Sequence, residues 1–187
     1  MITSHYTSRA FSLLEGLITV CLIAIFMSIS LPSIEEFIVK QRVQKEIITL
    51  QRTLSIARNY AVNYGDVTVV CPLKNNKCSN DWQSAISVFS DANRNYQLDS
   101  KEEVINISES SFETNHRYFS SKRRYIAFAP TGRLRGLSNG TFKICPIGMP
   151  RYAKGLIVSP SGRTYKSVNQ DSSDIEKTRS GKTILCN

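Results

Sequence analysis

The segment from Asp91 to Glu102 carries the side chains best suited to hold a metal ion. Oxygen-bearing residues recur in it with the spacing of a calcium-binding loop, at Asp91, Asn93, Asn95, Asp99 and Glu102. Tyr96 stands where such a loop needs glycine for a sharp turn, and the flanking sequence favours strands over helices. We therefore interpret the segment as an Asx-rich turn between two strands, with calcium binding as the alternative.

Candidate catalytic residues are scarce. The chain has two histidines, His5 and His116. His116 lies in a polar stretch without a nearby Cys or Ser nucleophile signature and is interpreted as a surface residue. Glu102 and Glu103 are interpreted as a solvated strand edge. The sequence therefore predicts neither an enzyme nor a bound cofactor.

The distribution of charge indicates a binding partner. The 187 residues carry a formal net charge of +9, but residues 117–187 hold 14 Lys and Arg against three Asp and Glu. The candidate phosphate contacts are Lys122, Arg123, Arg124, Arg133, Arg135, Arg163 and Lys166. Such a field attracts nucleic-acid phosphates, and nearby tyrosines offer faces for stacking on bases, namely Tyr118, Tyr125, Tyr152 and Tyr165.

Two segments in this basic stretch share a pattern. IAFAPTGRLR and LIVSPSGRTYK each lead from a predicted strand into Pro-x-Gly-Arg. Glycine supplies the positive φ of a tight turn, and the arginine then begins the next strand. Taken singly, each segment is a hairpin turn with a solubilising arginine; the functional interpretation is a phosphate contact.

The elements that position these residues follow from the periodicity. Apolar residues at spacings of three and four predict an amphipathic helix that ends near residue 62, before Gly65; they are Val43, Ile47, Leu50, Leu54, Ala57 and Ala61. Short apolar runs between turns then predict strands at 67–71, 85–89, 104–107, 125–129, 141–145, 156–159, 163–167 and 183–186. We expect an α+β fold in which an antiparallel sheet packs on the helix.

The N-terminal part of the chain is apolar from Phe11 to Leu31. As a helix, this run of about 20 residues would just cross a hydrocarbon core of about 30 Å. A secretory signal peptide does not fit, because the run exceeds an apolar region of about 7–15 residues and no small-x-small site follows it. Glu15 interrupts the run at a cost of about 2.5–3.5 kcal/mol in lipid, so it should have a partner.

The residues RAFSLLE, from Arg9 to Glu15, resemble the class III signal of type IV prepilins. The resemblance implies that a prepilin peptidase cuts between Ala10 and Phe11, which is then N-methylated, and that residues 1–10 are the leader. Ala10 departs from the glycine usual in the family. Glu15 becomes the fifth mature residue and serves assembly, because a free amine at Phe11 can compensate a carboxylate of a neighbouring subunit.

Pro32 falls where pilins carry a helix-kinking proline. The resemblance therefore implies one transmembrane and assembly helix over 11–62, kinked at Pro32, and a globular domain over 63–187.

Further segments resemble the GspH/FimT group of minor pilins and pseudopilins: CPLKNNKC with Trp82, residues 88–93, FAPTGR…GTFKICP and LIVSPSGRTY. The resemblance implies the type IV pilin fold and a low-abundance subunit at or near the tip of a type IV pilus. Its partners would be other major and minor pilins, the prepilin peptidase and the inner membrane before assembly. The globular domain would face the periplasm and later the cell surface.

Some members of this group contact double-stranded DNA for uptake in natural transformation, and the resemblance implies a Gly-Arg-x-Arg motif near the C-terminus for that role. Here the segment from Gly132 to Arg135 fits the motif at an earlier position, whereas the segment after Gly162 has Arg163 and then Lys166. The alternatives are a GspH-like minor pseudopilin of type II secretion with a structural role, and a simple membrane-anchored binding protein.

The five cysteines divide into one and four. Cys21 lies in the apolar run and is interpreted as a small packing residue. The other four allow three connectivities, of which we propose Cys71 with Cys78 and Cys145 with Cys186, conditional on export to the periplasm. Free thiols or zinc are the alternatives, and zinc is disfavoured because there is no second close pair of ligands. The sequence leaves open whether the tail over 168–182 is ordered.

Overall fold

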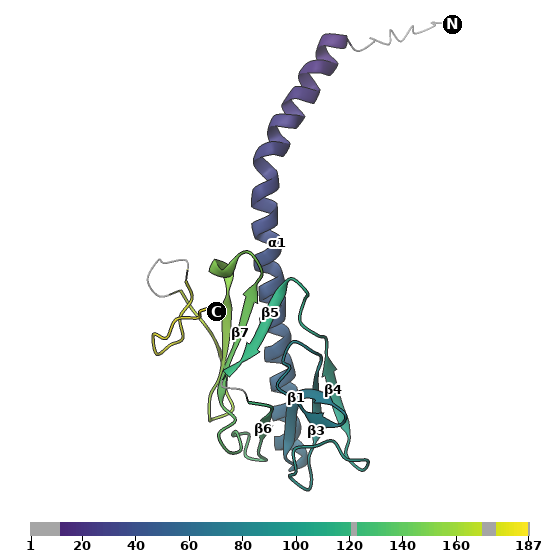
Figure 1. The fold of residues 1–187 in the computed structure, drawn as a ribbon, viewed down its shortest axis with the longest axis vertical. Coiled ribbons are helices and arrows are strands. Elements are labelled where there is room, and N and C mark those ends of the chain that lie inside the picture. Colours follow the sequence, from purple (N-terminus) through teal and green to yellow (C-terminus); the bar gives the residue numbers. More distant parts are fainter. Residues whose placement is uncertain (1–11, 121–122, 170–174, 187) are drawn as a thin grey trace, which may run out of the picture. The chain divides into compact units, whose positions relative to one another are not determined.

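The computed structural model describes residues 12–120, 123–169 and 175–186 (Figure 1). Helix α1 extends from Leu13 to Tyr64, and the chain divides into two compact units, Met1–Ile38 and Val39–Asn187. In the first unit, apolar side chains of α1 such as Leu13 and Phe26 are exposed. Within the described residues, no helix has both the length and the apolarity needed to cross a membrane.

In the second unit, α1 buries the apolar stripe that the spacing predicts. Its six members are at most 1% exposed: Val43, Ile47, Leu50, Leu54, Ala57 and Ala61. The helix continues two residues beyond the predicted end and stops at Gly65, whose φ of +76° suits glycine and whose N–H donates to the Ala61 carbonyl at 3.1 Å. The stripe contributes to a core that lies within 39–187, so this unit is expected to fold without the first.

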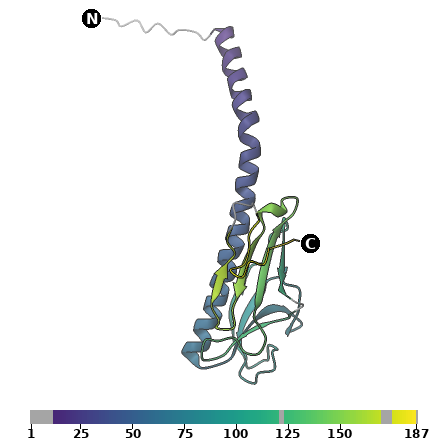
Figure 2. The same ribbon diagram turned by 90° about the vertical axis from the view of Figure 1, so that its left-hand side faces the viewer.

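Two antiparallel sheets make up the rest of the second unit (Figures 1 and 2). The first has the order β2-β1-β3-β4, with β6 also paired to β1; its strands are β1 (Thr68–Lys74), β2 (Lys77–Cys78), β3 (Ile86–Ser90), β4 (Val104–Ser108) and β6 (Ile126–Phe128). The second has the order β5-β7-β8-β9; its strands are β5 (Asn115–Phe119), β7 (Gly140–Pro146), β8 (Lys154–Val158) and β9 (Thr164–Lys166). A short 3-10 helix, η2 (Pro150–Tyr152), joins β7 to β8.

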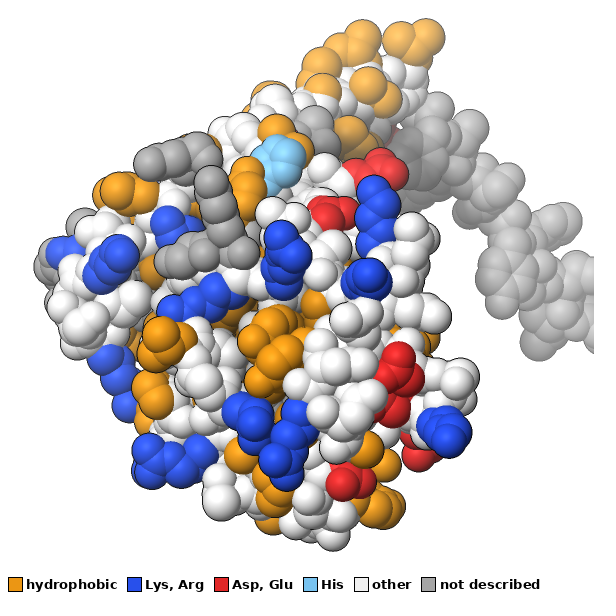
Figure 3. All heavy atoms as spheres, turned by 60° about the horizontal axis from the view of Figure 1, so that its bottom comes forward, with side chains coloured by type: hydrophobic (Ala, Val, Ile, Leu, Met, Phe, Trp, Pro, Cys, Tyr) orange, Lys and Arg blue, Asp and Glu red, His pale blue; other side chains and the backbone are white. Residues whose placement is uncertain are grey.

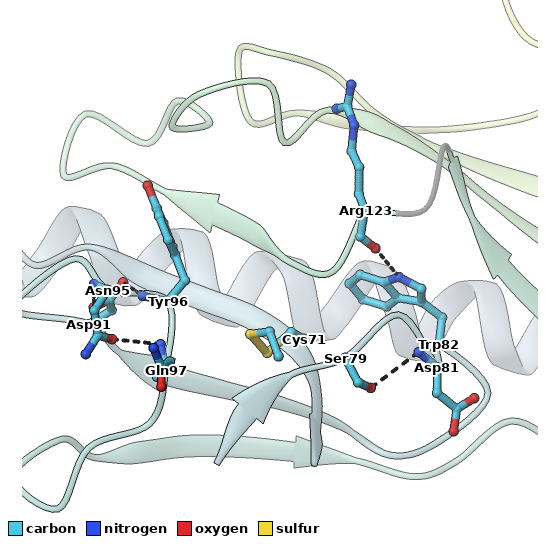
Figure 4. The surroundings of a disulfide bond; sticks show 10 residues. Cys71, Ser79, Asp81, Trp82, Asp91, Asn95, Tyr96, Gln97 and Arg123 are labelled. Atoms are coloured by element: carbon cyan, nitrogen blue, oxygen red, sulfur yellow. Dashed lines mark hydrogen bonds between the residues drawn. A yellow bond between two sulfur atoms is a disulfide. The ribbon is translucent and has the colours of Figure 1, made fainter. Parts of the chain in front are cut away.

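Side chains from both sheets meet α1 in one main core cluster. Trp82, in the connection from β2 to β3, lies 5.0 Å from Phe119 of β5 and 5.2 Å from Phe142 of β7 between ring centroids. Its indole N–H donates to the Arg123 carbonyl at 2.7 Å (Figure 4). The loop before β3 therefore ties the second sheet to the first.

Strand β5 was missed by the sequence prediction, and the predicted strand 183–186 is wrong. β5 alternates buried and exposed residues, but two of its inward positions are polar, Asn115 and Arg117, so no apolar run marks it. Thr183 forms only an isolated bridge with Lys177, so the described C-terminal residues add no strand to either sheet.

The structure contains both disulfides that the sequence predicts. Cys71 on β1 is joined to Cys78 on β2, with Cα atoms 5.5 Å apart, and this bond closes the hairpin (Figure 4). Cys145 on β7 is joined to Cys186, with Cα atoms 5.7 Å apart, and this bond attaches the C-terminal segment to the second sheet. Cys21 is a free, exposed cysteine.

Candidate nucleic-acid interface

The two Pro-x-Gly-Arg segments form turns with the same backbone geometry. In residues 129–133, the Gly132 N–H donates to the Ala129 carbonyl, and the Ala129 N–H donates to the Arg133 carbonyl, each at 2.8 Å. Residues 159–163 repeat both bonds at 2.9 Å. The glycines have φ of +73° and +75°, which explains why glycine occupies this position in each turn.

These paired turns, residues 129–133 and 159–163, are in direct contact. A Cβ atom on Gly162 would lie 2.0 Å from the Gly132 carbonyl oxygen, so only glycine allows the two backbones to approach this closely. The Leu134 N–H donates to the Pro160 carbonyl at 3.0 Å and joins the turns a second time. The sequence repeat therefore produces one composite structure from positions 30 residues apart.

Arg58 of α1 locks the paired turns to the helix. Its Nε donates to the Gly132 carbonyl at 2.9 Å, and the same atom lies 3.3 Å from the position of a Cβ on Gly162. Arg58 was not among the residues that the sequence singled out as candidate phosphate contacts. The sequence feature that could have indicated this role is the position of Arg58 next to Ala57, a member of the buried stripe.

Arg133 and Arg163 each follow the glycine of one turn, and both side chains are exposed. Because the turns are in contact, these two guanidinium groups start from neighbouring stretches of backbone. Within the described residues, neither is in an ion pair. We call Arg58, Arg133 and Arg163 the basic turn surface. The face in Figure 3 carries scattered Lys and Arg side chains, whereas its acidic side chains gather toward the right-hand side.

Two other predicted phosphate contacts have partners within the protein. The Nε of Arg135 donates to the Tyr96 hydroxyl at 3.4 Å, and the Tyr96 ring stacks on Tyr125 with centroids 4.1 Å apart. Burial raises the pKa of Tyr125, Tyr96 raises it further, and Arg135 lowers it. Arg123 is half-buried and donates to the backbone carbonyl and side-chain oxygen of Asn139.

The remaining predicted contacts differ in their positions. Arg124 precedes β6 and is exposed, and Lys166 ends β9 and is also exposed. Lys122 lies outside the described residues. Arg133, Arg163, Arg124 and Lys166 are therefore the exposed members of the predicted set within the described residues.

Arg117, at the start of the acid-free stretch, belongs to the core and not to the basic surface. Its side chain is 3% exposed, its Nε donates to the Trp82 carbonyl at 2.5 Å and its Nη2 donates to the Ser84 carbonyl at 2.8 Å. Burial lowers the pKa of Arg117, while the negative charges of Glu46 and Asp81 raise it. Arg117 therefore stabilises the connection from β2 to β3.

Most tyrosines expected to stack on bases already have partners. The central carbon of the Arg179 guanidinium lies 4.1 Å from the centroid of the Tyr165 ring. The Lys40 Nζ and the central carbon of the Arg151 guanidinium lie 4.6 and 4.7 Å from the centroid of the Tyr152 ring. Tyr125 is stacked as described above. Tyr118 is 46% exposed and is the best remaining candidate in this set for stacking on a base.

A comparison with family models matches residues 46–162 to the family described as "Type II transport protein GspH". This match covers more than half of the chain. The chain belongs to the GspH family. A comparison with curated proteins finds no match.

Solved structures similar to this GspH-family chain are minor pilins and pseudopilins. A crystal structure of the type IV minor pilin FimU from Pseudomonas aeruginosa is 21% identical, with a TM-score of 0.55 over 75% of this chain and 96% of that one. The minor pseudopilin EpsH of the Vibrio cholerae type II secretion system is 13% identical, with a TM-score of 0.50 over 72% of this chain and 99% of that one. These likenesses concern the fold: a long helix on antiparallel sheets.

In this GspH-family chain, the loop proposed as a turn is held by its own side chains. Asp91 is buried and accepts the backbone N–H groups of Asn95 and Tyr96 at 3.0 and 3.1 Å (Figure 4). Asp99 accepts the side-chain amides of Asn93 and Asn95 at 2.7 and 2.8 Å. Glu102 accepts two further backbone N–H groups. Asp91, Asn93 and Asn95 accept backbone N–H groups two to five residues further along, so the loop is rich in Asx-type bonds.

Tyr96 adopts a φ of +60°, the conformation that the sequence argument reserved for glycine. The bond to Asp91 and the stack on Tyr125 hold it there. Among the described residues, no group of three or more His, Cys, Asp or Glu is placed to hold a metal ion.

The predicted assembly residues lie in the first unit or outside the described part. Ala10 and Phe11 fall outside the described residues. Glu15 lies in the first turn of α1, where the helix dipole favours a carboxylate. Pro32 lies within α1, which continues through it. Cleavage, methylation and the kink stay predictions. His116 is exposed on β5.

Proposed function

We propose that this GspH-family chain is a minor pilin of a type IV pilus, located at or near the tip, and that it binds extracellular double-stranded DNA for uptake in natural transformation. The observation that carries the DNA role is the contact between the backbones of the paired turns, from which Arg133 and Arg163 extend, with Arg58 bonded to the same contact. The acid-free sequence around these turns supports it. Guanidinium groups bind phosphate oxygens with two parallel hydrogen bonds, which suits a DNA backbone.

The N-terminal sequence supports the assembly role. We propose that a prepilin peptidase cuts before Phe11, that Phe11 is N-methylated, and that the apolar segment holds the chain in the inner membrane with its globular unit in the periplasm before assembly. Glu15 would then pair with the amine of a neighbouring pilin. N-terminal sequencing of the protein from its native host tests this: Phe11 as first residue supports the proposal, and Met1 contradicts it.

DNA affinity tests the proposed role of the basic turn surface. The full chain in a neutral detergent is titrated with a fluorescent DNA duplex at 0.15 M salt. Arg133→Gln/Arg163→Gln is compared with Lys74→Gln/Lys77→Gln, which removes two exposed positive charges from the β1–β2 hairpin. We expect a large loss of affinity in the arginine variant and a small one in the lysine variant. Equal losses, or no binding by the unaltered protein, would contradict the proposal.

A second candidate function is that of a minor pseudopilin of type II secretion with a structural role. A groove between α1 and β4, with a volume of about 440 Å³, supports such a structural role. Ile48 on α1 and Ile107 on the edge strand β4 line this groove and are 51% and 64% exposed. Such a groove can seat an apolar side chain of a neighbouring subunit. Ile48→Glu should then abolish secretion in the native host, whereas in a DNA-binding pilin it leaves DNA affinity unchanged.

A further inference from the structure

The C-terminal segment crosses the second sheet as an ordered strap. We define the C-terminal strap as residues 175–186. Its Lys177 exchanges two backbone hydrogen bonds with Val168, each 2.9 Å long, and the Ile184 N–H donates to the Glu176 carbonyl at 2.9 Å. The disulfide to Cys145 fixes its far end to β7.

Packing holds the C-terminal strap against the sheet as well. Ile184 is 4% exposed and belongs to a small core cluster with Cys145 and Ala153. A Cβ atom on Gly155 of β8 would lie 2.7 Å from the Ile184 Cδ1, so glycine is what lets the strap lie this close to β8. The position of the strap is therefore set by contacts along most of its length.

Arg179 occupies a tight turn within the strap, in which the Gly181 N–H donates to the Thr178 carbonyl at 2.9 Å. Its guanidinium carbon lies 4.1 Å from the centroid of the Tyr165 ring. Tyr165 lines a pocket of about 200 Å³ together with Arg58 and Arg163. The strap thus brings a further cation to the edge of the basic turn surface.

The environment of Arg179 suits a ligand contact. The residue is exposed, and within the described residues its guanidinium forms no hydrogen bond or ion pair. Stacking on Tyr165 restricts the side chain while its N–H donors stay available, so less conformational freedom is lost when it binds a phosphate.

We propose that Arg179 is an additional phosphate contact of the basic turn surface, and that the Cys145–Cys186 disulfide positions it by holding the C-terminal strap. This inference rests on the proposed DNA binding. Neither the Gly-Arg pattern nor the strand predicted at 183–186 includes Arg179, which reaches the surface only through the fold.

The contact is tested by the salt dependence of duplex DNA binding to the full chain in detergent. Loss of one phosphate contact makes the negative slope of log K against log salt shallower by about 0.9. This change corresponds to about a fivefold loss of affinity at 0.15 M salt. We expect this for Arg179→Gln. Lys182→Gln removes the same charge from the same turn of the strap, at a residue that makes no cation–π contact with Tyr165 in the described part of the chain, and it should leave the slope nearly unchanged. Equal effects in the two variants would overturn the proposal.

The positioning role of the disulfide is tested by combining variants. Cys145→Ser/Cys186→Ser should weaken DNA binding when Arg179 is present and have little further effect in the Arg179→Gln background. Cys71→Ser/Cys78→Ser is the matched control and should leave the affinity unchanged. A further loss in the Arg179→Gln background would overturn the positioning role. If the unaltered protein bound no DNA, the proposed function itself would fail. If Arg179→Gln bound DNA as the unaltered protein does, only the role of Arg179 would fail.

Discussion

Replacing Gly162 by alanine should destabilise the second unit far more than the same change in an open turn. Two costs combine at this position. Alanine at a φ of +75° costs about 1–2 kcal/mol, as for other L-residues in the left-handed region. The new Cβ would also lie 2.0 Å from the Gly132 carbonyl oxygen, and forcing such backbones apart costs about 1–3 kcal/mol more. We therefore expect Gly162→Ala to lower the free energy of unfolding by about 2–5 kcal/mol.

Gly148→Ala is the matched control. Gly148 has a φ of +77°, and its Cβ would meet nothing within 4 Å, so only the cost of about 1–2 kcal/mol applies. Urea unfolding of residues 39–187 can be followed by the fluorescence of Trp82, which is 3% exposed and the single tryptophan of the chain. Equal destabilisation by the two variants would refute the contact between the paired turns.

Two further stability predictions concern the buried cation and the disulfides. Arg117→Met should lower the free energy of unfolding by about 3–5 kcal/mol, because the backbone carbonyls of Trp82 and Ser84 lose their buried donors and Glu46 loses a nearby positive charge. Urea unfolding measures this, and a loss below about 1 kcal/mol would contradict it. Replacing both cysteines of a disulfide by serine should cost about 4 kcal/mol for Cys145–Cys186 and about 2 kcal/mol for Cys71–Cys78, since the loops span 41 and 7 residues. Thermal unfolding of the two variants checks this order, and the reverse order would contradict it.

The sequence was sufficient to predict helices and strands where one face of the element is apolar. The stripe from Val43 to Ala61 is buried as its spacing predicts, because helical periodicity depends only on which residues are apolar. The strands flanking the paired turns were also found from their short apolar runs. Both disulfide pairs were predicted correctly, although the strand that Cys186 was expected to end does not form.

The sequence failed where polar residues face inward. β5 carries Asn115 and Arg117 into the interior, where the connections around β3 and the α1 carboxylate of Glu46 satisfy them. Their partners lie 30 or more residues away in the chain, so no local pattern reveals them. Arg117, Arg123 and Arg135 likewise bond to distant groups within the protein, so the count of basic residues overestimated how many are available to bind phosphate.

The candidate site could be predicted in part. Its repeated Pro-x-Gly-Arg motif identifies Arg133 and Arg163, but the contact between the turns depends on how two sheets meet at α1. Arg58 and Arg179 reach the site from the helix and the C-terminal strap. Only the three-dimensional structure brings these four arginines to one region.

The salt dependence of DNA binding tests the central claim most directly. The affinity of the full chain for a duplex is measured between 50 and 300 mM salt, alone and with Arg133→Gln/Arg163→Gln. If each arginine neutralises one phosphate, the slope of log K against log salt should become less negative by about 1.8 in the double variant. A slope that does not change, or the absence of binding by the unaltered protein at 50 mM salt, would contradict a nucleic-acid surface at the paired turns.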